Sequence, residues 1–350
     1  MKIYLPIKIT NFKLYNEVLP QLSEYYLNGG MENPIISFIN TEKINYECIP
    51  LIMGILDIIY NVNEEPVFLE FVYRPHLLYC LDHTLFFHYA KTELGYVEYD
   101  KELIGGFSDY IEKEYREAHI MHVYYPVQNF FSYSEDEQDE IRAQTYEEMR
   151  YHIVPLDYGT VLSDIKKLWI DEMENCRTLL AELITNARLY SMSLCYALLH
   201  SNMHKTMLSI CDVGNGFRHS LEKRRGSKSY SVECVEKFKT LKDGYIKKYG
   251  MYKLEDFFDI MEVLYYSELQ NRVNLAYLKK LVVNTGGVLR IQTGATQVVF
   301  TTNRCKGCDK KITDCVGCLL KGMSQDLKYS SIKCFESKLK GVRIEIEFGR

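Results

Sequence analysis

The order of three elements in the second half of the chain restricts its fold more than any other feature of the sequence. A segment with helical spacing around residues 175–199 precedes a short apolar strand at residues 207–213, and the strand runs into the turn Asp212-Val-Gly-Asn-Gly216. Each element is common on its own. Their order and spacing favour a functional site over a chance arrangement.

Glu182 and Asn186 lie four residues apart in the helical segment, so their side chains leave the same face of a helix. The amide of Asn186 could offer its carbonyl oxygen to Mg²⁺, which prefers oxygen ligands. The carboxylate of Glu182 could orient or deprotonate a water that attacks a γ-phosphate. A solvated Glu/Asn pair on a surface helix is the alternative. The apolar neighbours can cover the core side of the helix: Leu179, Leu180, Leu183 and Ile184.

Asp212 stands at the end of a strand expected to be buried. A carboxylate at this position can accept a hydrogen bond from an exocyclic amine such as N6 of adenine. Gly214 and Gly216 would let the backbone turn and approach a ligand closely. An ordinary tight turn is the alternative interpretation.

The E-x-x-x-N pair at Glu182 and Asn186 is called here the first box, and the D-x-G-x-G turn at Asp212 the second box. Taken together, the two boxes resemble those of the GHKL superfamily (Bergerat fold), which includes histidine kinases, anti-sigma serine kinases, Hsp90, MutL and type II topoisomerases. The resemblance covers about residues 150–350. It implies an α/β sandwich with a mixed sheet on one side and helices on the other. It also implies that Glu182 is the general base where hydrolysis occurs, that Asn186 binds Mg²⁺, and that Asp212 binds adenine beside Gly214 and Gly216.

The phosphate side of the site departs from the family pattern. The best candidate for the G-x-G-L lid, whose backbone amides and helix N-terminus hold phosphates, is the run 272–275, which lacks both glycines. Arg272 could supply charge in compensation. Gly341-Val342 stands where a G-T box is expected, with the hydroxyl lost. ATP binding is therefore expected, whereas hydrolysis is left open.

The histidines do not point to a sensor histidine kinase. His152 is the nearest candidate for a phosphoacceptor upstream of the first box. It is followed by Pro155 in a sequence typical of a strand or loop, and a structural role is favoured for it. His200 and His204 lie four residues apart at the end of a segment, 160–200, expected to be helical. They could form a metal pair, and charge at a helix C-terminus is the commoner reason for such residues.

Four cysteines form the pattern C-x2-C-x6-C-x2-C, at Cys305, Cys308, Cys315 and Cys318. Four thiolates in two turns that contain glycine fit a closed, structural Zn²⁺ site, and zinc is favoured. An iron–sulfur cluster and four free thiols are the alternatives. The metal would staple an insertion at about residues 303–338. Most other cysteines are expected to be small buried side chains: Cys48, Cys80, Cys176, Cys195, Cys211 and Cys234.

The first part of the chain is expected to form a small α/β domain. Strand candidates at 34–40 and 66–71 alternate with helix candidates at 47–61 and 75–93, and the continuous apolar strands fit a sheet covered on both faces. By pattern alone this region weakly resembles STAS-like domains, which implies an interaction or dimerisation module. The expected organisation is an α/β domain at 1–130, a linker at 131–148 and the GHKL-like domain with its cysteine insertion at 149–350. The charged part of the linker, 134–148, could instead be the start of a solvated helix.

The remaining expected elements complete the second domain. One long helix is expected at 259–285, followed by strands at 288–294 and 296–303. A final strand is expected at 341–348, where alternating apolar and charged residues fit an antiparallel strand with one solvated face.

Charge and hydropathy limit the functional classes. The net charge of -5 and the pI near 6.0 disfavour a protein whose main task is to neutralise nucleic-acid phosphates. No apolar run reaches the roughly 18 residues of a membrane span, and the N-terminus does not resemble a signal peptide, so the cytoplasm is the expected compartment and no membrane association is expected.

The expected function is that of an ATP-binding bacterial regulator of the GHKL class. Bound nucleotide, with Mg²⁺, would set its conformation for a protein partner or within a homodimer. One alternative is an active ATPase or a serine/threonine protein kinase resembling the anti-sigma kinases, so whether the chain is an enzyme stays open. A zinc-stapled scaffold with a vestigial nucleotide site is the other alternative.

Overall fold

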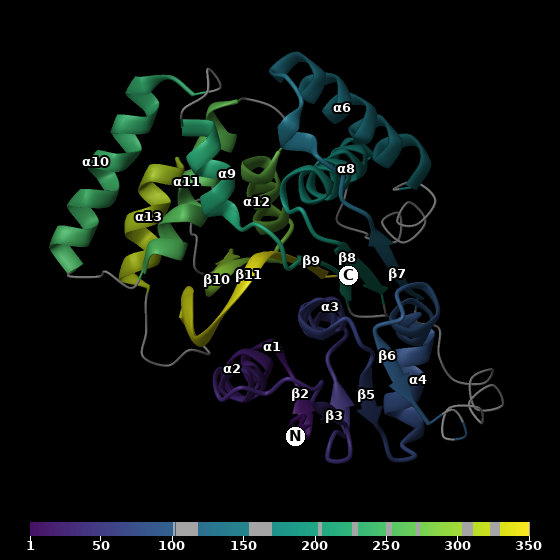
Figure 1. The fold of residues 1–350 in the computed structure, drawn as a ribbon. Helices are drawn as coiled ribbons and strands as arrows, with labels where there is room; N and C mark the ends of the chain where they lie inside the picture. The colour runs from purple at the N-terminus through teal and green to yellow at the C-terminus, as the bar shows by residue number, and fades with distance from the viewer. Residues whose placement is uncertain are drawn as a thin grey trace.

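A computed structural model describes most of the chain (Figure 1). The described residues are 1–100, 102, 118–153, 170–201, 205–225, 230–249, 254–270, 274–302, 311–322 and 330–349. Within them the chain forms two main β-sheets with helices around them, a mixed α/β architecture. None of the described helices combines the length and the apolar character needed to cross a membrane.

The first sheet belongs to the N-terminal unit and its described strand pairs are all parallel, in the order β1-β3-β5-β6. Parallel neighbours need crossover connections, and helices supply them here. The elements of this unit are β1 (Lys2–Tyr4), β2 (Lys8–Ile9), α1 (Asn11–Lys13), η1 (Leu14–Val18), α2 (Leu19–Leu27), β3 (Ile35–Ser37), β4 (Lys43–Ile44), η2 (Tyr46–Cys48), α3 (Ile49–Asn63), β5 (Val67–Glu70), α4 (Pro75–His83), η3 (His88–Glu93) and β6 (Val97–Tyr99).

Helix α3 shows how the sequence produces this unit. Pro50 lies in its first turn, where a missing backbone N–H costs no hydrogen bond, as the sequence predicted. Ten of its residues are buried, from Ile49 to Ile59, so the helix is covered almost all round. It lies between the first sheet and the second (Figure 1).

The second sheet has the order β10-β11-β9-β8-β7, and every described pair in it is antiparallel. The family resemblance implies a mixed sheet, and the described pairs differ from this expectation because none of them is parallel. The cause is local, because strands that follow one another through a short connection, such as β8 and β9, pair antiparallel. The strands are β7 (Ala118–Tyr124), β8 (Cys195–Ser201), β9 (Lys205–Asp212), β10 (Val288–Thr301) and β11 (Ile332–Gly349).

Helices cover one face of the second sheet. They are α6 (Glu135–Glu148), α8 (Ile170–Tyr190), α9 (Phe217–Arg225), α10 (Val232–Tyr249), α11 (Glu255–Leu269), α12 (Leu275–Asn284) and α13 (Ile312–Lys321), with the short η5 (Phe130–Ser132) and η6 (Met149–Ile153) near α6. Apolar side chains of α8, α11 and α12 form one buried cluster with the sheet.

Two boundaries differ from the sequence expectation. The helix expected to extend to residue 200 ends at Tyr190, and residues 195–201 form β8, because an apolar run that is buried on both faces has no period that separates strand from helix. The helix expected at 259–285 is divided into α11 and α12, since Asn274 caps a new helix with its side chain.

Strands β10 and β11 form a long hairpin, longer than the separate strands that the sequence indicated. The two expected strands at 288–294 and 296–303 are one strand with an irregular register around Gly294. There the carboxylate of Asp256, on α11, accepts a hydrogen bond from the backbone N–H of Ala295 at 3.0 Å. The expected last strand at 341–348 begins nine residues earlier, at Ile332.

The N-terminal unit covers the other face of the second sheet. In β8 the side chains of Cys195 and Ala197 join the cluster under the helices, whereas Tyr196 and Leu198 join the core of the N-terminal unit. This alternation explains why the strand is apolar throughout. Close contact is made at Gly54 of α3, where a Cβ atom would lie 2.5 Å from Cγ1 of Val213.

A buried ionic network joins the two units. Arg343 and Glu345 of β11 are 2% and 3% exposed and form an ion pair at 2.5 Å. The guanidinium of Arg343 also donates to the backbone oxygen of Glu47, and Asn11 donates to the carboxylate of Glu345. The ion pair offsets part of the cost of burying these charges, while Nε and Nη1 of Arg343 have no hydrogen-bond partner among the described residues.

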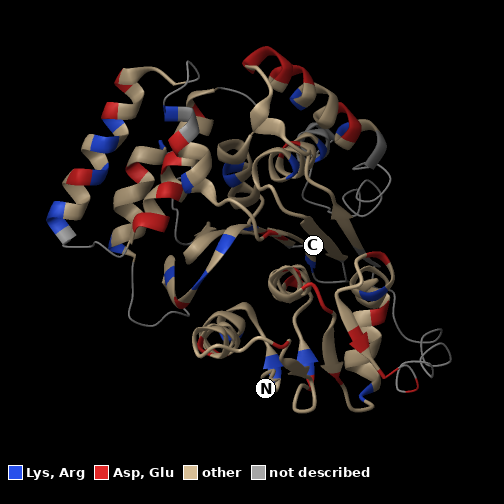
Figure 2. Ribbon diagram, viewed as in Figure 1, with Lys and Arg blue, Asp and Glu red and all other residues tan. Residues whose placement is uncertain are grey.

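The segment around residue 130 is closely attached to the second sheet. Strand β7 lies inside the range 1–130 that the sequence assigns to the first domain, yet it pairs with β8. The charged stretch, for which the sequence allows a linker or a solvated helix, forms the helix α6. It begins with a capping box between Ser134 and Glu137 and packs on α8. Acidic residues cover much of this helix (Figure 2).

Candidate functional site

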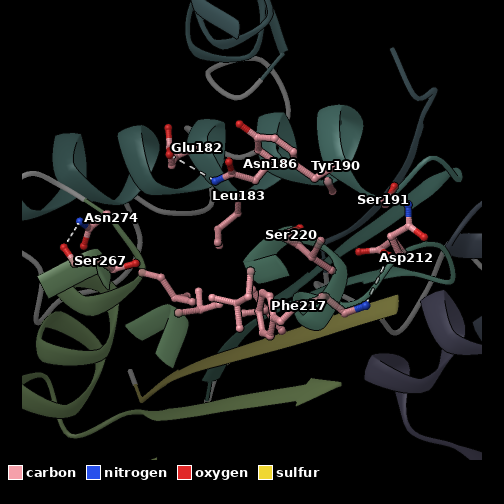
Figure 3. Close-up of a pocket in the computed structure, with 18 of the residues that line it drawn as sticks. Glu182, Leu183, Asn186, Tyr190, Ser191, Asp212, Phe217, Ser220, Ser267 and Asn274 are labelled. Atoms are coloured by element: carbon pink, nitrogen blue, oxygen red, sulfur yellow. Dashed lines mark hydrogen bonds between the residues drawn. The ribbon is translucent and has the colours of Figure 1, made fainter. Parts of the chain in front are cut away.

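A pocket that is partly open to solvent lies between α8 and the second sheet, and the empty space in and above it, open solvent included, is about 1030 Å³. Residues from α6, α8, α9, α11, α12, β9 and β11 line it. In Figure 3 Glu182, Asn186 and Tyr190 follow one another along α8, with Asp212 near one end of the pocket and Asn274 near the other. The pocket therefore brings together the side chains of both sequence boxes.

Helix α8 presents one stripe of polar side chains to the pocket. Glu182, Asn186 and Tyr190 are spaced by four residues, which places them on one face over about 12 Å. The amide nitrogen of Asn186 donates to Oε1 of Glu182 at 3.2 Å. The four apolar neighbours expected to face the core are all buried: Leu179, Leu180, Leu183 and Ile184.

A cation from another helix holds the carboxylate of Glu182. Nη2 of Arg142, on α6, lies 2.5 Å from Oε1 of Glu182, and Nη1 donates to the hydroxyl of Tyr190 at 3.0 Å. The side chains of Arg142 and Glu182 are 21% and 13% exposed, so solvent screens this pair less than a surface ion pair. Sequence reasoning missed Arg142, because a lone arginine in a charged helix carries no motif.

The carboxyl group of Asp212 is buried at the end of β9 and lines the pocket. Its Oδ1 atom accepts hydrogen bonds from the backbone N–H groups of Gly214 and Val342, each at 3.3 Å. Burial raises the pKa of Asp212 to about 7, against the smaller opposite effect of these two hydrogen bonds. The carboxyl group is thus fixed by the backbone and poised to change its charge near neutral pH.

Glycines around Asp212 allow the backbone segments to approach closely. A Cβ atom on Gly214 would lie 1.8 Å from the backbone oxygen of Ser191, and one on Gly216 would lie 2.8 Å from Oγ1 of Thr293. Gly341 has a φ of 97° and would place a Cβ atom 2.1 Å from the backbone oxygen of Asp212. The Gly341-Val342 pair therefore lies against Asp212, although these residues are far apart in sequence.

At the other end of the pocket, Asn274 is the N-cap of α12. Its side-chain oxygen accepts hydrogen bonds from the backbone N–H groups of Ala276 at 3.1 Å and Tyr277 at 3.3 Å. Its amide nitrogen donates to the backbone oxygen of Ser267 at 2.5 Å. The amides of the helix that follows the expected lid at 272–275, which would face phosphates, are thus engaged by a side chain. Arg272 lies outside the described residues.

The cysteine pattern falls partly outside the described residues, which exclude Cys305 and Cys308. Cys315 and Cys318 lie in α13, so the turn expected at Gly317 is helical instead, because Val316 and Leu319 pack into the core. Cys315 is buried and its Sγ accepts a hydrogen bond from Nζ of Lys279 at 3.2 Å, whereas Cys318 is exposed. Within the described part of the chain, His, Cys, Asp and Glu form no group of three suited to a metal.

The other cysteines and histidines have structural environments. Four of the cysteines expected to be buried are so: Cys48, Cys80, Cys195 and Cys211. His200 lies in β8 rather than at a helix end, and burial lowers its pKa to about 4. It stacks on Tyr46 with ring centroids 4.2 Å apart, which fits a neutral core histidine. His204 lies outside the described residues, as does the side chain of His152.

No family model, curated protein or solved structure matches this chain. The functional inference therefore rests on the geometry and chemistry of the pocket.

Proposed function

We propose that this chain is an ATP-binding regulatory protein of the GHKL class, in which the nucleotide occupies the pocket between α8 and the second sheet. One observation carries the proposal: Glu182, Asn186 and Asp212, which two separate sequence boxes supply, line the same pocket. Seven of the described helices and strands contribute to its lining, and polar groups at both ends with apolar side chains between them suit a ligand with a flat ring and a charged tail.

The Asp212 end of the pocket suits an adenine base. The carboxylate can accept a hydrogen bond from the exocyclic amine, while Oδ1 stays fixed by the backbone of Gly214 and Val342. Apolar side chains nearby offer faces on which a flat ring can lie, among them Ile210, Val342 and Ile344. A guanine would present a carbonyl oxygen at the position of the amine, which a carboxylate repels.

Asn186 is the proposed Mg²⁺ ligand. Its amide nitrogen is engaged by Glu182, so its carbonyl oxygen is the atom suited to a hard cation. Mg²⁺ in nucleotide sites takes few protein ligands and is completed by phosphate oxygens and waters. One amide oxygen beside the phosphates is consistent with that pattern.

Hydrolysis is the second candidate activity, and Glu182 is the residue that favours it. Its carboxylate lines the pocket on the same face as Asn186. In the structure the carboxylate is engaged by Arg142 at 2.5 Å, so this contact must open before the carboxylate can reach a water. Nucleotide binding is therefore the primary proposal, and turnover requires that this ion pair opens.

A regulatory role follows from what packs behind the pocket. Val213 follows Asp212 directly and contacts Gly54 of the N-terminal unit. A nucleotide that moves the Asp212 turn would therefore move a residue in the core of that unit. Such a switch needs a partner that binds the two states differently, and the N-terminal unit is the proposed place for a protein partner or a second copy.

The proposal is tested by calorimetric titration of the full chain with ATP and with GTP, in Mg²⁺ and in EDTA. We expect ATP to bind at least about tenfold more tightly than GTP, because adenine carries its amine at position 6, where guanine has a carbonyl oxygen. We also expect Mg²⁺ to strengthen ATP binding. Equal binding of both nucleotides, or no binding, would contradict the adenine assignment.

A further inference from the structure

Arg142 is the residue of the pocket whose role the family resemblance does not define. It belongs to α6, outside both sequence boxes, yet its guanidinium reaches Glu182 and Tyr190 on α8. Among the lining residues that the structure describes, Arg142 is the one cation, beside the two carboxyl groups of Glu182 and Asp212. Its position therefore decides where the pocket can accept negative charge.

The pocket has a direction along α8. The Asp212 turn lies at the C-terminal end of this helix, where the backbone N–H of Asn215 donates to the backbone oxygen of Ser191 at 2.7 Å. Glu182 lies about two turns away, toward Asn274 in Figure 3. An adenine held by Asp212 would therefore extend its phosphates along Asn186 toward Glu182 and the Arg142 Nη2 atom that contacts it.

The usual source of phosphate contacts is occupied at this end. The N-terminus of α12 faces the pocket, but the side-chain oxygen of Asn274 already accepts hydrogen bonds from the backbone N–H groups of Ala276 and Tyr277. A helix N-terminus attracts phosphate mainly through such amide groups. A triphosphate at this end thus needs charge from elsewhere, in addition to Mg²⁺.

We propose that Arg142 binds the terminal phosphates of ATP, and that its guanidinium leaves the Glu182 carboxylate for phosphate oxygens when the nucleotide enters. The inference rests on the proposed function. A guanidinium suits this role because its planar set of N–H donors matches phosphate oxygens and stays charged at any physiological pH. The exchange also takes the guanidinium away from Glu182, so one residue of α6 couples phosphate binding to the surroundings of this carboxylate.

The test compares ATP, ADP and adenosine in their binding to the wild type and to Arg142→Gln, with Mg²⁺ present. We expect Arg142→Gln to weaken ATP binding about tenfold or more and to change adenosine binding less than twofold. Arg142→Lys keeps the charge but loses the planar geometry, so we expect its affinity for ATP to lie between those of the wild type and Arg142→Gln. Thermal unfolding of each variant checks that the fold is kept.

Arg188→Gln is the matched control. Arg188 pairs with Glu148 at 2.9 Å, so it joins the same two helices, but it does not line the pocket. We expect it to leave ATP affinity within twofold of the wild type. An equal loss of ATP and adenosine binding in Arg142→Gln would overturn the inference, as would no loss or an equal effect of Arg188→Gln.

The two proposals fail in different ways. If wild-type protein binds adenosine and ATP but Arg142→Gln shows no selective loss of ATP, the phosphate role of Arg142 is wrong and the nucleotide site stands. If the wild type binds no adenine nucleotide, the proposed function is wrong and the inference falls with it.

Discussion

The backbone N–H of Val342 donates a hydrogen bond to Oδ1 of Asp212 at 3.3 Å, which joins the last strand of the sheet to the turn after β9. Gly341 makes this approach possible, since a Cβ atom there would overlap the backbone of Asp212. The buried carboxyl group is therefore positioned by two separate chain segments. Its protonation should report on the state of the site.

The buried carboxyl of Asp212 should make stability depend on pH. Burial raises its pKa from 3.8 to about 7, so between these values the native chain holds a proton that the unfolded chain has lost. Stability is then lost as pH rises through this window. Asn resembles a protonated Asp, so we expect the wild type to lose about 2 to 3 kcal/mol relative to Asp212→Asn between pH 5 and pH 8, measured by urea unfolding.

The comparison with Asp212→Asn removes the contribution of other buried acids, such as Asp57 and Asp259, whose pKa values burial also raises. A constant stability difference between wild type and variant from pH 5 to pH 8 would show that Asp212 is ionised throughout, contrary to the burial argument.

Glu182→Gln should strengthen ATP binding. The carboxylate competes with phosphate for Arg142, and a glutamine keeps an oxygen for Asn186 while it removes the charge. We expect ATP affinity to rise roughly two- to tenfold and adenosine affinity to stay unchanged, in calorimetric titrations. Glu148→Gln, which breaks the neighbouring pair with Arg188, is the control. Weaker ATP binding in Glu182→Gln would mean that the carboxylate does not compete with the phosphates.

Gly54→Ala should destabilise the contact between the N-terminal unit and the pocket. The new methyl group would lie 2.5 Å from Cγ1 of Val213, in a buried position. Overpacking of this kind costs typically about 1 to 3 kcal/mol, which exceeds the helix propensity that alanine adds. Denaturant unfolding measures the change in the free energy of unfolding.

Gly244→Ala is the matched control for this substitution. Gly244 lies within α10, is exposed, and has nothing within 4 Å of its added Cβ atom. We expect it to stabilise the chain by about 0.5 to 1 kcal/mol. In Gly54→Ala, the additional change Val213→Ala should cost less than it does alone, because it relieves the overlap. Additive costs would contradict a direct contact.

The cysteine cluster predicts bound zinc. We expect about one Zn²⁺ per chain in the wild type and its loss in Cys318→Ser, as measured by elemental analysis of purified protein. Cys234→Ser is the control, because Cys234 lies on α10 outside the pattern. Iron in place of zinc would support an iron–sulfur cluster. The absence of metal from the wild type would contradict the zinc site and support four free thiols.

Much of the first unit could be predicted from sequence, because its signals are local. Pro50 and Pro75 lie in the first turns of α3 and α4, and the apolar runs near 35 and 67 are strands in a parallel sheet. The continuous apolar sequence of β8 did not distinguish a strand from a helix, because a strand that packs on both faces shows no alternation of apolar and polar residues. What covers its second face, the N-terminal unit, is a long-range property that no local pattern encodes.

The candidate site was predictable to the same extent. Glu182, Asn186 and Asp212 follow motifs, and they line one pocket. Arg142 could not be identified, because its function depends on α6 packing against α8, a contact between residues 40 apart in sequence. The cap at Asn274 was also missed, although an asparagine before an apolar run is a known helix start.

Binding of ATP by Asp212→Asn is the most direct test of the central claim. We expect this variant to lose at least about tenfold in affinity for ATP and for adenosine alike, because its amide presents donors to the adenine amine. Asp243→Asn, the same change at an exposed position of α10, should bind as the wild type does. Wild-type affinity in Asp212→Asn would contradict the assignment of this pocket to adenine nucleotides.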